Sequence, residues 1–261
     1  MRAIGSEQAG QGRRGEEKIE TRGIFLLPMG DASGRRGDMP RIARTVVAGV
    51  PHHVYQRALP GKKAFLTAQD YQTYLELLKE KAALHKVDIL AYCLLPDGVH
   101  VVAVPHDKRG LAGTMSRTHF NYVQYLNRRR GRSGQLWRNR FLSCAVEKRA
   151  LETVVQYVEW RPVGEGLARK AEKYAWSSAA AHAGGRDKSG VLARKVWPGK
   201  KKLARWGQRL GKPLDKKLQR QIRTRTQTGL PFGSAAFIKS LERKLRRVLH
   251  ARPVGRPRVE D

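Results

Sequence analysis

Two short apolar runs, residues 89–95 and 99–104, have the length and composition of buried strands. They flank Pro96-Asp97-Gly98, where proline and glycine favour a tight turn, so the pattern predicts a β-hairpin. An earlier run of β-branched and aromatic residues, 46–57, predicts a further strand. These strands together predict a small β-sheet.

Apolar positions at helical spacing predict four helices. The first follows Thr67-Ala68-Gln69-Asp70, which resembles a capping box with Asp in the acidic position. The others span about 110–130, 147–160 and 234–249. We expect Pro162 to end the third helix, because proline cannot continue the backbone hydrogen bonding. Helices between strands predict an α+β domain.

Composition divides the chain into three parts. Residues 1–38 are rich in glycine and charge and lack a periodic apolar pattern, which predicts a disordered extension or a misassigned start. Residues 39–185 carry the α+β pattern, and residues 186–261 read as a basic helical C-terminal extension on a linker. The longest apolar runs fall far short of the ~20 residues of a membrane span, so we expect no membrane partner.

The net charge of the chain indicates which class of partner it binds. It has 53 Lys and Arg against 22 Asp and Glu, a net charge of +31, of which +12 lies on residues 39–185 and +18 on residues 186–261. Such an excess on a folded chain indicates a polyanion, most commonly nucleic acid. Two cysteines within apolar stretches fit a reduced, intracellular protein. With a nucleic-acid partner, we expect the protein to be cytoplasmic and associated with the nucleoid. By charge alone, an RNA-binding accessory protein fits equally.

Two side chains are candidates for chemistry. His100 begins the second hairpin strand, although a lone strand histidine more often has a structural role. Tyr157 lies at the edge of the apolar stripe of its helix, where it is either a nucleophile toward a phosphodiester or a residue at the rim of the core. His52 and His53 are adjacent on a strand and point to opposite faces, so they do not share an ion, and we expect one to be buried and one exposed.

A basic segment with interleaved aromatic residues predicts nucleic-acid binding, since arginines neutralise phosphates and aromatic rings stack on bases. The candidate DNA-binding residues are Arg128, Arg129, Arg130, Arg132, Trp137, Arg138 and Arg140. Near the C-terminus, Gly255-Arg256-Pro257 is a narrow extended strip that fits the A/T minor groove through Arg256, or is a plain disordered tail.

Several motifs in the same order resemble the REP-associated tyrosine transposases, within the single-tyrosine HUH, transposase IS200-like superfamily. The resemblance covers about residues 39–183. It is carried by Gly49-Val50-Pro51-His52-His53-Val54, Ala91-Tyr92-Cys93-Leu94-Leu95-Pro96, Tyr125-Leu126-Asn127-Arg128-Arg129, Gly131-Arg132-Ser133-Gly134, Leu136-Trp137, Arg140-Phe141, Tyr157-Val158-Glu159 and Trp176-Ser177-Ser178-Ala179-Ala180.

The resemblance implies a ferredoxin-like α+β domain, with an antiparallel sheet and helices on one face, that binds imperfect DNA hairpins, often as a homodimer. It also implies cleavage of single-stranded DNA in transposition. Mg²⁺ or Mn²⁺ would be held by a His-hydrophobic-His pair and a polar residue, and a tyrosine, here Tyr157, would attack the phosphate.

The metal site departs from that pattern. Gly98 stands where the family has its first histidine, two residues before His100, and Arg161 stands where it has a polar ligand, four residues after Tyr157. Asp97 is the remaining oxygen donor nearby. We therefore expect DNA binding with weak or absent cleavage, and the degenerate metal site leaves open whether the chain is an enzyme. The alternative is a working transposase in which Asp97 and His100 hold the metal and Arg161 stabilises the transition state.

Overall fold

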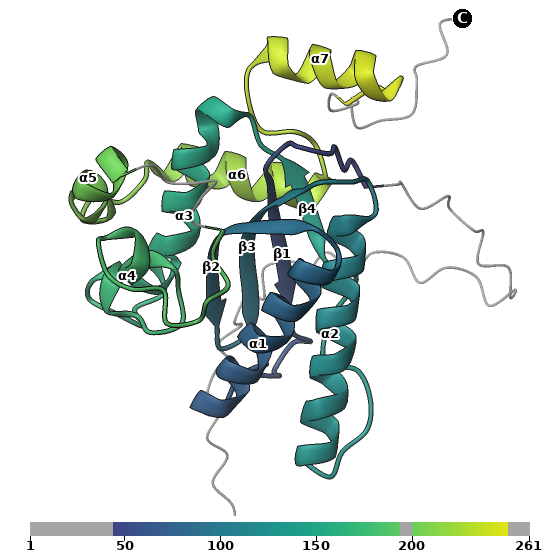
Figure 1. Cartoon of the computed structure of the whole chain (residues 1–261), viewed down its shortest axis with the longest axis vertical. Helices are drawn as coiled ribbons and strands as arrows, with labels where there is room; N and C mark the ends of the chain where they lie inside the picture. Colours follow the sequence, from purple (N-terminus) through teal and green to yellow (C-terminus); the bar gives the residue numbers. More distant parts are fainter. Residues whose placement is uncertain (1–43, 194–199, 250–261) are drawn as a thin grey trace, which may run out of the picture. The chain divides into compact units, whose positions relative to one another are not determined.

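Strands and helices follow one another in the order β1, α1, β2, β3, α2, β4 in the first part of the described chain. The computed structural model describes residues 44–193 and 200–249 (Figure 1). The expectations for residues 1–38 and for the C-terminal strip with Arg256 lie outside these residues.

The four strands form one sheet in the order β2-β3-β1-β4, and every neighbouring pair is antiparallel. The strands are β1 (His52–Arg57), β2 (Val87–Leu95), β3 (Gly98–Pro105) and β4 (Leu142–Ala145). With one helix after β1 and another after β3, this is the ferredoxin-like βαββαβ arrangement. The prediction of an antiparallel α+β fold is confirmed.

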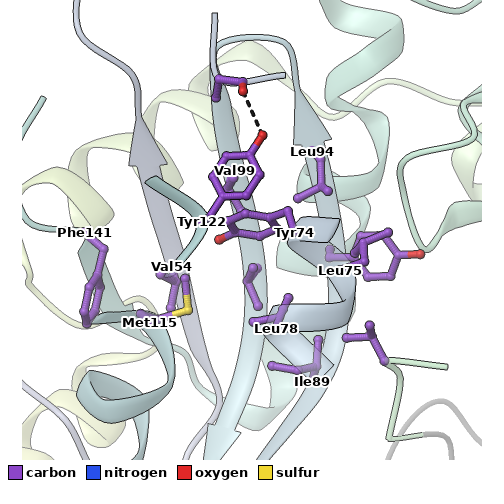
Figure 2. Close-up of a cluster of buried hydrophobic side chains, with 14 of the residues drawn as sticks. Val54, Tyr74, Leu75, Leu78, Ile89, Leu94, Val99, Met115, Tyr122 and Phe141 are labelled. Atoms are coloured by element: carbon purple, nitrogen blue, oxygen red, sulfur yellow. Dashed lines mark hydrogen bonds between the residues drawn. The ribbon is translucent and has the colours of Figure 1, made fainter. Parts of the chain in front are cut away.

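Two helices, α1 (Ala68–Leu84) and α2 (Gly110–Arg129), cover one face of the sheet (Figure 1). The predicted capping box starts α1: Thr67 Oγ1 accepts the Asp70 N–H at 3.3 Å, and the Asp70 carboxylate accepts the Thr67 N–H at 3.1 Å. Figure 2 shows the core between these helices and the sheet, where the Tyr122 hydroxyl donates to the Ala64 carbonyl at 2.8 Å. This apolar core packs α1 and α2 against one face of the sheet.

A second layer of helices covers the opposite face, in addition to the expected pair. In this layer α3 (Leu151–Gly164) and α6 (Lys216–Thr228) contact the strands, and α5 (Lys200–Leu210) packs against α3 (Figure 1). Their buried residues Trp206 and Ile222 belong to the same apolar cluster as Cys93 and Val158. The C-terminal helices α5 and α6 therefore help to form the core of this face.

Local boundaries differ from the sequence patterns at a few places. The prediction that Pro162 ends its helix was wrong, because α3 continues to Gly164 and buries Pro162 two residues before its end, where a missing N–H costs a single helical bond. The first strand begins at His52 rather than at residue 46. The remaining elements are two short 3₁₀ helices, Lys148–Ala150 and Ala171–Lys173, and the helices α4 (Ala179–His182) and α7 (Ala235–Leu245).

No helix in the described part of the chain has the length and apolar composition that crossing a bilayer requires.

Candidate functional site

A cavity of about 210 Å³ lies between the second face of the sheet and the helices that cover it, several times the ~30 Å³ that one water molecule occupies. Strands β1 and β3, the turn before β3, and helices α3 and α6 all contribute to its wall. The residues that line it are His53, Tyr55, Arg57, Leu95, Asp97, His100, Tyr157, Arg161, Glu165, Arg223, Thr226 and Gln227.

The structure brings together the candidate residues of β3, the turn before it and α3. His100 and Tyr157 lie with their ring centroids 6.0 Å apart in an edge-to-face arrangement, and Asp97 lines the same cavity. Arg161 follows Tyr157 by one helical turn, and its guanidinium carbon lies 5.8 Å from the tyrosine ring centroid. Because α3 continues through Pro162, both side chains stay on the face of the helix that is turned to the cavity.

His53 is a member of the site that the sequence did not indicate. Its Nε2 lies 3.0 Å from Nδ1 of His100, and the two rings stack. The expectation that one histidine of the pair is exposed was wrong: His52 and His53 are both buried. The His52 ring instead bonds to backbone groups of its own loop, including the Val50 carbonyl at 2.8 Å. The signal for His53 is the strand register, which pairs it with Val102 beside His100.

A chain of hydrogen bonds assigns the protons of the two neutral rings. Thr226 Oγ1 donates to the Ile222 carbonyl at 2.8 Å, so it accepts from His53 Nδ1–H at 2.7 Å. His53 Nε2 then accepts from His100 Nδ1–H, which leaves a lone pair on His100 Nε2. Burial, and after it the charge of Arg161, lowers the pKa of His53 to about 3. Burial, the His53 ring and Arg161 likewise lower the pKa of His100, so both rings are neutral at pH 7.

Charged side chains surround the mouth of the cavity. Arg161 pairs with Glu165 one turn later on α3, and Arg57 pairs with Asp97 at 2.9 Å. The Arg57 side chain is 56% exposed and that of Asp97 40%, so this pair faces solvent. Arg223 of α6 lines the same cavity and is exposed.

Tyr157 itself is buried at the cavity wall. Burial raises the pKa of its phenol, while the positive charges of Arg161 and Arg223 oppose that shift. With the pKa above its ordinary value, the phenol carries its proton at neutral pH. Tyr157 therefore needs a base, or a stronger positive charge, before it can act as a nucleophile.

Gly98, two residues before His100 on β3, contributes no side chain to the cavity. A Cβ atom at Gly98 would lie 2.9 Å from the backbone oxygen of Gln56 on the paired strand β1. That distance is shorter than van der Waals contact, so a larger residue requires the two strands to move apart. On the neighbouring strand β1, the ring of Tyr55 stacks on the His100 ring, with centroids 4.6 Å apart.

The donor atoms of the cavity do not fit a divalent cation. His100 Nε2 is one unpaired imidazole nitrogen, while both nearby carboxylates, Asp97 and Glu165, are ion-paired with arginines. Within residues 44–193 and 200–249, no group of three His, Cys, Asp or Glu side chains is placed to hold a metal ion. A cation here would also meet the charges of Arg57 and Arg161.

The predicted DNA-binding segment is divided between surface and core. Trp137 is buried against His119, with ring centroids 4.9 Å apart, so its indole packs in the core and is not exposed for base stacking. Arg129 and Arg130 are paired with Asp70 at 2.5 and 3.3 Å. The exposed arginines of the segment are Arg128, Arg129, Arg132, Arg138 and Arg140.

The basic segment meets the cavity at Arg57. The Arg138 N–H donates to the Arg57 carbonyl at 2.9 Å, and the Gln56 side chain donates to the Asn139 carbonyl at 2.9 Å. Arg138 and Arg140 are both exposed, and the backbone of Arg138 is bonded to that of Arg57, whose side chain lines the cavity.

Two solved structures are similar to this chain at low sequence identity. A REP-associated tyrosine transposase bound to a REP hairpin is 17% identical, with a TM-score of 0.49, over 61% of this chain and 89% of that chain. A putative transposase from Deinococcus radiodurans R1 is 15% identical, with a TM-score of 0.33, over 45% of this chain and 94% of that chain. No curated protein matches the chain.

The family model described as transposase IS200 like matches residues 57–161. The matched part contains Arg57, Asp97, His100, Tyr157 and Arg161. The contributions of His53, on β1, and of α6 to the cavity lie outside it. The similarity of this chain to the transposase IS200-like family is therefore carried by residues 57–161.

Proposed function

We infer that the chain is a DNA-binding protein of the REP-associated tyrosine transposase type, which recognises single-stranded or hairpin DNA and has an impaired cleavage centre. The transposase IS200-like domain and the net charge of +31 support a DNA partner. The motif resemblance supports a hairpin as its form. A homodimer and an association with the nucleoid stay predictions from the same resemblance and charge.

The observation that carries this proposal is the composition of the cavity. Tyr157 and His100 lie in it together, as cleavage would need, but the donors for a divalent cation are missing among the described residues. Arg161 brings a positive charge to the side of Tyr157 instead. Exposed arginines beside the mouth still offer contacts to a phosphate backbone.

The test is an adduct assay with a REP-like hairpin that carries single-stranded flanks. In Mn²⁺ we expect the wild-type protein to bind the hairpin, as fluorescence anisotropy reports, without forming a covalent protein–DNA species on a denaturing gel. Tyr157→Phe is the test variant and Tyr125→Phe, on α2, the matched control. An adduct that disappears in Tyr157→Phe and persists in Tyr125→Phe would contradict the proposal that the cleavage centre is impaired.

The second candidate is an active transposase that cuts DNA through a phosphotyrosine. It is favoured by the position of Arg161, 5.8 Å from the Tyr157 ring centroid, where a guanidinium can stabilise charge on the attacked phosphate. The adduct just described would establish it. Tighter binding of duplex RNA than of hairpin DNA would contradict both candidates and favour the RNA-binding alternative.

A further inference from the structure

Two buried polar atoms at the cavity have no hydrogen-bond partner among the described residues: Nε2 of His100 and Nε of Arg161. Buried polar groups in folded proteins are nearly always paired with protein groups, ligands or water, so an unpaired acceptor and an unpaired donor on residues of one cavity indicate that a ligand or water binds there. Both residues line the cavity, one from the sheet and one from α3. The ligand and any water molecule bound with it therefore have to supply both an acceptor and a donor.

The charges of the lining residues define the sign of that ligand. Arg57, Arg161 and Arg223 come from β1, α3 and α6, and they face the two carboxylates Asp97 and Glu165. With neutral histidines the lining carries one net positive charge. A singly charged anion balances it, while a divalent cation would add to it.

We propose that Arg57, Arg161 and Arg223 bind one phosphodiester group of DNA in this cavity without a metal ion. The choice of ligand rests on the proposed DNA-binding function. Each guanidinium offers several N–H donors to phosphate oxygens, including the unpaired Arg161 Nε–H. A water molecule that donates one proton to His100 Nε2 and the other to the phosphate satisfies the remaining acceptor.

In this site the positive charge lies on arginine side chains, whereas in a metal centre it lies on a bound cation. The arginines are part of the chain, so the positive charge is present before the phosphate arrives and does not depend on dissolved cations. Arg223 belongs to α6, outside the family-matching part, which makes the C-terminal region a component of the site. Mg²⁺ or Mn²⁺ is then expected to weaken binding slightly through screening.

The test uses the full chain with dimethyl phosphate as the probe, in excess EDTA. Nuclear magnetic resonance of the histidine imidazoles and of the arginine Nε–H groups is expected to show saturable shifts at His100 and Arg161. Arg161→Gln and Arg223→Gln are each expected to weaken binding about tenfold or more, as the loss of a charge-assisted hydrogen bond does. Arg243→Gln, which removes the same charge from the exposed face of α7, is expected to leave the affinity unchanged.

The proposal would be overturned if dimethyl phosphate caused no saturable shifts, or if its binding required Mn²⁺. It would also be overturned if Arg161→Gln and Arg223→Gln bound dimethyl phosphate within about twofold of Arg243→Gln. Binding would then depend on the net charge of the protein and not on the position of the arginines. Since Arg223 is exposed, its variant keeps the core and tests the site even if Arg161→Gln unfolds. Binding of hairpin DNA in EDTA distinguishes a failure of this inference from a failure of the proposed function. If the protein binds the hairpin but not dimethyl phosphate, only the phosphate site is contradicted. If it binds dimethyl phosphate but not the hairpin, only the proposed DNA-binding function is contradicted.

Discussion

His53 and Thr226 show how single hydrogen bonds orient the site. The Thr226 hydroxyl accepts from His53 Nδ1, and His53 in turn accepts from His100. All three side chains are buried, so each bond replaces one that water would supply in the unfolded chain. The hydroxyl of a C-terminal helix thereby determines which nitrogen of His100 keeps a lone pair that no described residue pairs with.

Replacing Thr226 by valine keeps the shape of the side chain but leaves the His53 Nδ1–H buried without its acceptor. We expect the free energy of unfolding to fall by about 1–3 kcal/mol, measured by urea denaturation. Thr228→Val is the matched control, because Thr228 also donates to a carbonyl one turn earlier, at 2.9 Å, but is exposed. Equal losses in the two variants would contradict a role for the His53 contact.

At this scale the sequence predicted some of the site residues and missed others. Tyr157, His100 and Arg161 were identified from motif positions and meet in one cavity. His53 was missed because the pairing of β1 with β3 places it beside His100, and a pairing register is a property of two strands. Trp137 was assigned to the surface because its neighbours are arginines, although its ring completes the core.

Among the elements, α3 holds the site on one side and anchors the C-terminal helices on the other. Glu159, fully buried in α3, accepts the Trp206 indole N–H of α5 at 2.6 Å and contacts His182 of α4 at 2.5 Å. A buried carboxylate needs such partners to offset the loss of hydration. One residue of α3 thus fixes both α4 and α5.

Trp206→Phe removes the N–H that Glu159 accepts and keeps most of the apolar contact. We expect unfolding to become easier by about 1–3 kcal/mol, since a buried charged group loses a partner. Thermal denaturation followed by circular dichroism measures the effect. Trp176→Phe serves as the control, because Trp176 stacks on Tyr71 at the other core. A stability of Trp206→Phe equal to that of the control would contradict the anchoring role.

Elements with strong local signals were predicted, and elements defined by distant partners were not. The capping box of α1 and the turn between β2 and β3 follow from neighbouring residues. The helices α5 and α6 have few apolar positions among many basic ones, and the buried ones, such as Trp206 and Ile222, acquire their role only against the sheet. The reading of residues 186–261 as a basic extension stays a prediction, although α5 and α6 also bury core residues.

Across the whole molecule, buried histidines link folding to pH. Burial lowers the pKa of His52 to about 4 and that of His53 and His119 to about 3, against an ordinary value of 6.5. The unfolded chain therefore binds protons at these rings below pH 6.5, whereas the folded chain does not until about pH 4 or lower. The contribution of these histidines to the free energy of unfolding is therefore fully present above pH 6.5 and is lost as the pH falls.

Urea denaturation between pH 7 and pH 4 measures this dependence. Each of these histidines is expected to contribute about 1.4 kcal/mol per pH unit below 6.5. His119→Gln, which retains an acceptor for the Tyr74 hydroxyl, is expected to reduce the slope. A slope that is the same in wild type and His119→Gln would contradict the linkage.

The cavity also has a consequence for the time at which the protein becomes competent. Its wall includes His53 near the start of the described chain and Thr226 near its end. A ribosome that has released only the family-matching residues has made Tyr157, His100 and Arg161 but has not yet made α6. Because α6 supplies Arg223 and Thr226 to the wall, the nascent chain cannot close the cavity before α6 has been made, and a product terminated before α6 would have an incomplete cavity.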